Sequence, residues 1–139
     1  MADRFMAEAK ALDILRSLTS STYAPRSIEI KSKPFTELKF AFLWAVSLGV
    51  IEGTRTSLQG TKDGVFMTSN LNDDQKAFLY TIAIAETDNL EVVENEDTVV
   101  SIAEEYANTG AYRLRELLLD APGDELWNLV SFIRSEASK

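Results

Sequence analysis

The chain has 139 residues with 22 acidic and 14 basic side chains, so its formal net charge is −8, and it contains no histidine and no cysteine. These two absences exclude zinc sites that need Cys or His ligands, Ser-His-Asp and Cys-His relays, disulfide frameworks and CxxC redox motifs. Catalysis would have to use carboxylates, lysine, tyrosine or hydroxyls, and neighbouring acids such as Glu104 and Glu105 diverge by about 100° on a helix. We therefore predict a protein that is not an enzyme and holds no cofactor and no metal, with a carboxylate-metal hydrolase as the enzymatic alternative.

The length and composition predict one domain over residues 1–139. Apolar residues make up 45% of the chain and charged residues 26%, which is ordinary for a globular protein. The longest apolar-rich stretch, residues 38–51, contains Lys39 and is shorter than the ~20 residues that a membrane-spanning helix needs. The first residues also lack the uninterrupted hydrophobic stretch of a secretory signal, so we expect a cytoplasmic protein without a membrane segment.

Apolar spacing predicts two helices in the first half of the chain. Residues 3–18 carry apolar side chains at steps of three and four, from Phe5 to Leu18. Residues 27–31 alternate between apolar and polar side chains, as a short strand does. A second helix is expected to begin near Pro34 and to end at Gly49 or Gly53. Its large side chains are predicted to lie in the core; they are Phe35, Phe40, Phe42 and Trp44.

The second half begins with a polar loop, residues 53–70, that includes a possible short strand at residues 65–67. A third helix is predicted from a cap at Asn72 or Asp73 to a stop at Asp88 and Asn89. Its buried side is expected to consist of Phe78, Leu79, Ile82, Ile84 and Ala85.

Beyond residue 88 we expect one helix around residues 99–107, another around residues 114–118 with Gly110 at the junction, and a last helix after Pro122. Trp127 and Phe132 of this last helix are predicted to pack in the core. The predicted fold is mainly α, with five or six helices around a single core and at most a minor β element between the second and third helices.

Charge is unevenly distributed. Up to Asp63 there are nine basic and seven acidic residues, and after it five basic and fifteen acidic, so the two parts carry +2 and −10. Residues 86–105 contain eight acids and no base. Such a segment repels phosphate backbones. A basic patch in the first half remains an alternative, and the residues that could form it are Arg26, Lys31, Lys33, Lys39, Arg55 and Lys62.

The segment EEYANTG, residues 104–110, has two interpretations. Ala107 and Gly110 are small enough to let two backbones approach closely, which indicates a junction between helices. The polar neighbours could instead form a docking surface for another protein chain. The possible partner contacts are Glu104, Glu105, Tyr106, Asn108 and Gly110.

Three blocks of the sequence together resemble a known family. They are FAFLWAVSLGVIEGTR, FLYTIAIAETDNLEVVENED and IAEEYANTGAYRLRELLLDAPGDELWNLVSFI. From about Phe35 to Ile133 the chain resembles the accessory proteins of bacterial DNA phosphorothioation systems called DNA phosphorothioation-associated, or Dnd system-associated, protein 4. The resemblance implies a cytoplasmic bacterial protein linked to sulfur modification of the DNA backbone, or to the restriction machinery that spares modified DNA, and it carries over no catalytic residue.

These observations predict a non-catalytic accessory protein of a modification or restriction (defence) system, whose partners are other proteins of that system. The alternative is a DNA-binding regulator, because a strand at residues 27–31 followed by a helix loosely suggests a ribbon-helix-helix module. A homodimer is also open, since Trp44, Trp127 and several apolar helices could exceed what one small core encloses.

Overall fold

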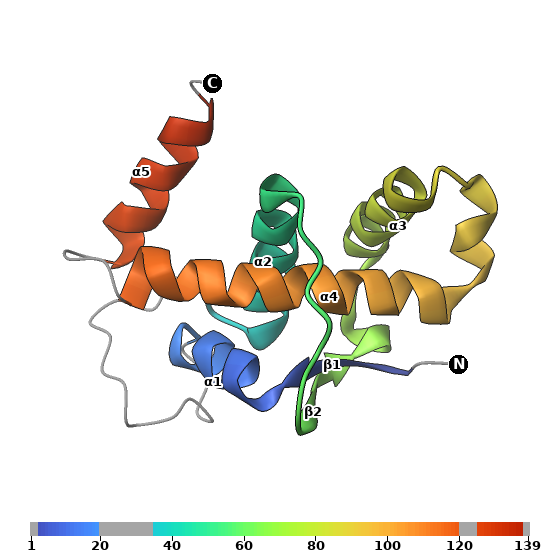
Figure 1. The fold of residues 1–139 in the computed structure, drawn as a ribbon, viewed down its shortest axis with the longest axis horizontal. Helices are drawn as coiled ribbons and strands as arrows, with labels where there is room; N and C mark the ends of the chain where they lie inside the picture. Colours follow the sequence, from blue (N-terminus) through green and yellow to red (C-terminus); the bar gives the residue numbers. More distant parts are fainter. Residues whose placement is uncertain (1–2, 20–34, 120–124, 138–139) are drawn as a thin grey trace.

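A computed structural model of the chain describes residues 3–19, 35–119 and 125–137. The fold is mainly α, as predicted, and these described ranges contain five α-helices and a small two-stranded antiparallel sheet (Figure 1). The elements are β1 (Arg4–Glu8), α1 (Ala9–Ser17), α2 (Leu38–Glu52), β2 (Lys62–Met67), the 3₁₀ turn η1 (Thr68–Asn70), α3 (Asp73–Thr87), the 3₁₀ turn η2 (Leu90–Glu94), α4 (Glu96–Leu114), the π-helical turn η3 (Arg115–Leu119) and α5 (Glu125–Ala137).

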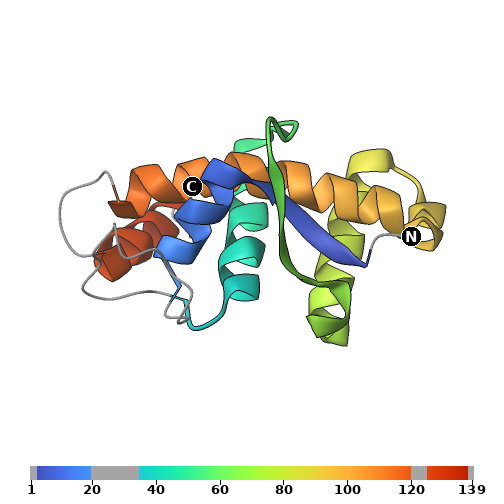
Figure 2. The same ribbon diagram turned by 90° about the horizontal axis from the view of Figure 1, so that it is seen from below.

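Helix α4 is the longest element and runs along the long axis of the molecule, with α2 crossing it (Figures 1 and 2). The two backbones touch at glycines. A Cβ atom on Gly110 would lie 1.6 Å from the carbonyl oxygen of Ala45, and one on Gly49 would lie 2.1 Å from that of Tyr106. Only glycine fits at these two positions, because any side chain would overlap the backbone of the other helix.

The predicted helix over residues 3–18 is wrong in its first part. Residues 4–8 form β1, which pairs with β2 through a bulge after Phe5, and only Ala9–Ser17 are helical. Phe5 and Ala7 face the core with 2% and 7% of their surface exposed, the alternation of a strand. The ring of Phe5 packs against Phe42 and Phe66, with centroids 5.0 and 4.8 Å away. This long-range aromatic packing, together with the pairing to β2, overrides the helical spacing of the local sequence.

The ends of α2 and α3 agree with the predicted stop and start signals. Gly53 ends α2 with φ +72°, the left-handed conformation that glycine adopts readily. Asn72 caps α3 by accepting from the backbone N–H of Gln75, whose side chain in turn accepts from the Asn72 N–H. Asp88 ends α3 with φ 54°. The predicted short strand at residues 65–67 lies within β2.

The two predicted helices form one continuous stretch, α4 followed directly by the π-helical turn η3, without a break at Gly110. Gly110 lies inside α4 because its missing side chain serves the contact with α2, and the helix instead widens into η3 after Leu114. Helix α5 follows where the last helix was expected. Phe132 is half-buried, with the guanidinium of Arg113 5.5 Å from its ring centroid.

Most predicted core residues that the structure describes do pack in the core. Phe35 and Phe42 are buried, and Phe40 and Trp44 are half-buried against them. On α3, Leu79 is buried and Ile82 and Ile84 are half-buried. Phe78, which is 37% exposed, and Ala85 are exposed, so the predicted burial of these two residues was wrong. The predicted start of the second helix near Pro34 is too early: α2 begins at Leu38, because Glu37 is extended and the backbone N–H of Phe35 donates to Leu18 instead. The predicted strand at 27–31 lies outside the described residues, and the surroundings of the Trp127 side chain are not described. No helix within the described ranges is long and apolar enough to cross a membrane.

Candidate functional site

Three consecutive residues of the segment EEYANTG contact three different parts of the chain. Glu104 accepts a hydrogen bond from the backbone N–H of Met6 in β1 at 2.6 Å. Glu105 forms an ion pair with Arg55, in the loop after α2, at 2.9 Å. Tyr106 donates from its hydroxyl to Glu86, at the end of α3, at 2.5 Å. This part of α4 therefore joins β1, the loop after α2 and α3.

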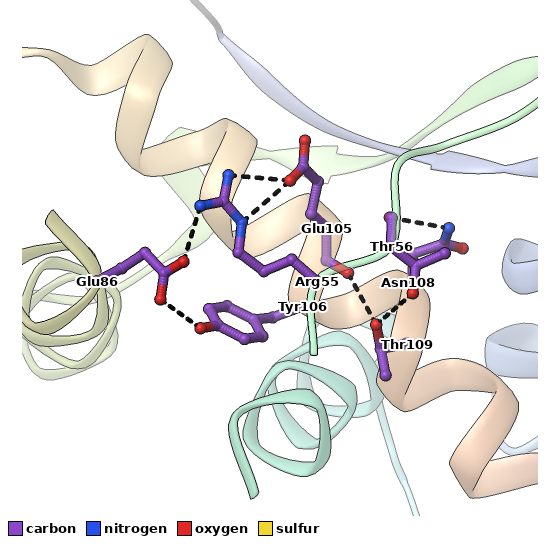
Figure 3. A network of polar contacts seen from close by, with 7 residues as sticks. All are labelled: Arg55, Thr56, Glu86, Glu105, Tyr106, Asn108 and Thr109. Atoms are coloured by element: carbon purple, nitrogen blue, oxygen red, sulfur yellow. Dashed lines mark hydrogen bonds and ion pairs between the residues drawn. The ribbon is translucent and has the colours of Figure 1, made fainter. Parts of the chain in front are cut away.

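Arg55 lies at the centre of a cluster that we call the polar junction, whose members are Arg55, Thr56, Glu86, Glu105, Tyr106, Asn108 and Thr109 (Figure 3). Its guanidinium lies 2.9 Å from a carboxylate oxygen of Glu86 and 2.9 Å from one of Glu105. The hydrogen bond to Glu86 contributes most to raising the pKa of Arg55. The hydrogen bond from Tyr106, followed by that from Arg55, lowers the pKa of Glu86. Both groups are thus held in their charged forms.

Asn108 fixes the loop after α2 from the other side of the polar junction. Only 3% of its surface is exposed, and its amide nitrogen donates to the backbone oxygen of Thr56 at 3.2 Å and to that of Ser57 at 3.4 Å. The same nitrogen donates to the carboxylate of Glu8 at 2.9 Å. Within the described part of the chain its amide oxygen is buried without a hydrogen-bond partner.

Glu8 collects hydrogen bonds from residues about fifty and a hundred positions away. Its carboxylate accepts from the hydroxyl of Tyr112, the backbone N–H of Gln59 and the amide of Asn108. Burial acts to raise the pKa of Glu8, but these hydrogen bonds, with that of Tyr112 the largest, outweigh it and lower the pKa. Burial, followed by the bond to Glu8, raises the pKa of Tyr112 to about 12. The pair stays as a carboxylate and a neutral phenol at neutral pH.

Glu104 behaves differently from its neighbours. Burial raises its pKa, although the hydrogen bond from Met6 and the positive charge of Lys62 act in the opposite direction. A carboxylate that loses contact with water favours its neutral form. Burial thus favours the neutral form of the Glu104 carboxyl.

The polar junction is built to hold elements together. Its charged members, Arg55, Glu86 and Glu105, are paired with one another, and its hydroxyls and amide donate to or accept from neighbouring groups. No three carboxylates gather closely enough to hold a metal ion anywhere in the described ranges. What the arrangement does chemically is fix the geometry of α3, α4 and the connecting loop.

The residues predicted to contact a partner are divided by burial. Tyr106, Asn108 and Gly110 are buried, whereas Glu104 and Glu105 are half-buried. Gly110 contacts the backbone of α2. The buried residues of the segment make contacts within the chain. The two acids at its start keep partial access to solvent.

Two described residues of the possible basic patch, Lys39 and Arg55, lie at opposite ends of α2. Lys39 lies in the first turn of α2, where its ammonium donates to the backbone oxygen of Asn70 at 3.0 Å. Arg55 lies beyond the other end of this helix, and 15 helical residues span about 22 Å. Arg55 is paired with two acids, and the charge of Lys62 acts on Glu104. The remaining three, Arg26, Lys31 and Lys33, lie outside the described residues.

An acidic surface lies next to the polar junction. It comprises Asp88, Glu91, Glu94, Glu96 and Asp97, which come from the end of α3, η2 and the first turn of α4. All are exposed except Glu96, which is half-buried. Leu90, at the start of η2, is 74% exposed among them. This surface presents negative charge and one apolar side chain to solvent.

Sequence reasoning identified Glu104–Gly110 as a special segment but not its partners. Glu8, Glu86 and Tyr112 received no role, and Arg55 was assigned to a possible basic patch. One signal could have found part of the cluster: Arg55, Glu86 and Tyr106 come one each from the three blocks that carry the family resemblance. The contact between Glu8 and Asn108 spans 100 positions, and no local pattern encodes it.

Comparison with known proteins gives one positive result. The sequence model of the family described as DNA sulphur modification system-associated protein 4 matches residues 13–139. This agrees with the resemblance noted from the three sequence blocks. Searches of curated proteins and of solved structures return no match.

Proposed function

We propose, since the chain belongs to the family of DNA sulphur modification system-associated protein 4, that it serves such a system as a non-catalytic accessory protein that binds the system's other proteins. The family description supplies the association with DNA sulphur modification. The binding of protein partners, the absence of catalysis and the cytoplasmic location are parts of the proposal.

The acidic surface is the observation that carries this proposal. Its carboxylates lie on the exposed side of η2 and the start of α4, and the sequence from residue 86 to 105 places no cation between them. A surface of one sign attracts partners of the opposite sign and sets their approach. In the polar junction, negative charge is balanced locally, because Arg55 lies between Glu86 and Glu105. Partner binding is therefore assigned to the acidic surface rather than to the polar junction.

Affinity purification from the native host tests the proposal. The tagged full-length protein is expected to recover components of the modification or restriction machinery, identified and quantified by mass spectrometry. The double variant Glu91→Lys, Glu94→Lys reverses two exposed charges of η2 and is expected to lower that recovery at least tenfold. The double variant Asp13→Lys, Asp63→Lys makes the same change of net charge at exposed positions on α1 and β2 and serves as the control.

Two results would count against the proposal. One is the recovery of no modification or restriction component by the unmodified protein. The other is an equal loss with both double variants, because that would assign the effect to net charge and not to this surface.

The alternative of a DNA-binding regulator has a direct test. The acidic surface repels phosphates, and Lys39 and Arg55 are separated by the length of α2. We expect no retardation of duplex DNA at low salt. Retardation that weakens steeply as salt rises would favour the alternative instead.

Self-association is a separate part of the proposal. Val50, Ile51 and Ile133 are large apolar side chains with 41%, 54% and 42% of their surface exposed, and a second copy of the chain could cover them. Light scattering of the purified protein decides this. A mass of about twice 15.5 kDa supports a homodimer, and a mass near 15.5 kDa excludes it.

A further inference from the structure

A cavity of about 250 Å³ lies beside the acidic surface, between β1, η1, α3 and the first turns of α4. These elements meet at one end of the molecule (Figures 1 and 2). Its floor is apolar and consists of Phe5, Leu71, Leu79, Val99 and Val100. All five are buried core residues, with 2–7% of their surface exposed. The base of the cavity is thus formed by side chains of the hydrophobic core.

The cavity is suited to one large side chain. A cavity of about 150 Å³ lined by apolar residues already admits a benzene ring, whereas pockets for drug-sized ligands are about 300–1,000 Å³. At about 250 Å³, this cavity admits an aromatic or long aliphatic side chain with little space left. Side chains of this kind, seated in desolvated pockets, dominate the binding energy of protein interfaces.

The rim of the cavity indicates what surrounds that side chain. Glu96 lines the cavity and is also a member of the acidic surface, so the two are continuous. Asp73 and Asp74 lie in the first turn of α3, one turn before Lys76, the cation that lines the cavity. Neither Glu96 nor Lys76 forms an ion pair with another described residue. The carboxylates of Glu96 and of the adjoining acidic surface outnumber the single ammonium of Lys76, and this excess of negative charge beside the cavity favours a positively charged ligand.

We propose that this cavity and the adjoining acidic surface form one docking site for a protein segment that carries a large apolar side chain flanked by lysine or arginine. The apolar side chain enters the cavity, and the flanking cations face Glu96 and the carboxylates of η2. This inference rests on the proposed function, because it names the chemistry of the partner that the acidic surface binds.

Peptide binding followed by nuclear magnetic resonance tests the site on the intact chain. The probe is the peptide Lys-Lys-Trp-Lys-Lys, compared with Lys-Lys-Ala-Lys-Lys and Glu-Glu-Trp-Glu-Glu. We expect the first peptide to shift the backbone amide signals of Lys76, Leu79, Val99 and Val100, with saturation in the millimolar range or below. The other two are expected to bind at least tenfold more weakly, because each lacks one half of the recognised chemistry.

A substitution at the rim separates the cavity from general charge attraction. Ser69 is exposed on η1 and lines the cavity, so the indole of Ser69→Trp is expected to fill the cavity. This variant should bind the peptide Lys-Lys-Trp-Lys-Lys at least tenfold more weakly. Ser101→Trp, at an exposed position of α4 that does not line the cavity, is the matched control and is expected to bind as the unmodified protein does. Equal binding of the tryptophan and alanine peptides, or shifts confined to other surfaces, would overturn the proposal.

Purification with the same two variants distinguishes this inference from the proposed function. If Ser69→Trp loses the partners that Ser101→Trp retains, both are supported. If Ser69→Trp retains them while Glu91→Lys, Glu94→Lys loses them, the cavity is not the docking site and the acidic surface alone binds. If the unmodified protein recovers no partner, the proposed function fails, whatever the peptides show.

Discussion

The two halves of α4 differ in what they contact. From Tyr106 onward, the helix is covered: Gly110 touches the backbone of α2, and Asn108 is buried against the loop that follows α2. Over its first two turns, the helix carries Glu96 and Asp97 at the surface and Val99 and Val100 on the floor of a cavity. The helix is continuous, so these differences come from what packs on it.

This difference indicates that one half of α4 stabilises the fold and that the other half is available for binding. The covered half has backbone contacts with α2 and hydrogen bonds to the loop after α2, which hold the fold together. The open half places the carboxylates of Glu96 and Asp97 at the surface and lines part of a cavity of about 250 Å³. We therefore expect substitutions in the covered half to act on stability and substitutions in the open half to act on binding.

The largest effect is expected at the crossing of α2 and α4. Gly110→Ala would place a Cβ atom 1.6 Å from the Ala45 carbonyl oxygen, which belongs to a buried backbone and cannot move aside. We expect the free energy of unfolding to fall by about 3 kcal/mol or more, measured by urea denaturation. In the control Gly64→Ala, the added Cβ meets only the flexible side chain of Arg4 at 3.4 Å, and a change below about 1 kcal/mol is expected. Comparable losses in the two variants would contradict the close contact of the helices.

The next largest effect is expected at the polar junction. Asn108→Ala removes the donor to the backbone oxygens of Thr56 and Ser57 and to Glu8. The loss of these part-buried hydrogen bonds should lower the free energy of unfolding by about 2 kcal/mol. Thr109→Val removes the hydrogen bond between the hydroxyls of Thr109 and Thr56, which is partly exposed. This variant should lower the free energy of unfolding by about 0.5 kcal/mol. If the Thr109 variant proves the less stable of the two, Asn108 is not what holds this loop.

A smaller effect is expected at Glu104, visible as a dependence on pH. Burial raises the pKa of Glu104 above 4.5 in the folded state, so its contribution to stability is present below that pH and is lost as pH rises through the folded pKa. Glu104→Gln stays neutral and keeps an oxygen for the N–H of Met6. The stability of this variant relative to the unmodified protein should therefore rise between pH 4 and pH 7, measured by urea denaturation at several pH values. A relative stability that falls over this range would show that the charged form is favoured instead.

The smallest effect on stability is expected at the acidic surface. Glu91→Lys changes an exposed residue of η2, so the free energy of unfolding should change by no more than about 0.5 kcal/mol. Partner recovery is nevertheless expected to fall. Gly110→Ala is expected to lower stability, whereas Glu91→Lys, beside the open half of α4, is expected to lower binding. A large loss of stability in the Glu91 variant would contradict the expected difference between residues that act on stability and residues that act on binding.

The sequence by itself determined the helices whose signals are local. Asn72 and Gln75 mark the start of α3, Gly53 the end of α2, and the density of acids in residues 86–105 reveals a negative segment. It also singled out residues 104–110, because small and polar residues alternate there. These features depend on neighbours within a few positions, so they can be read from the order of the residues.

Only the tertiary structure decided the identity of β1, the role of Gly110 and the partners of Arg55. Residues 4–8 become a strand because β2, about sixty positions away, supplies its hydrogen bonds. Gly110 lies inside a helix because Ala45 occupies the space of its missing side chain, and Arg55 is paired because α3 and α4 bring Glu86 and Glu105 to it. Each of these features depends on contacts between distant segments. The local spacing of residues does not encode which distant backbone or charged group will lie next to them.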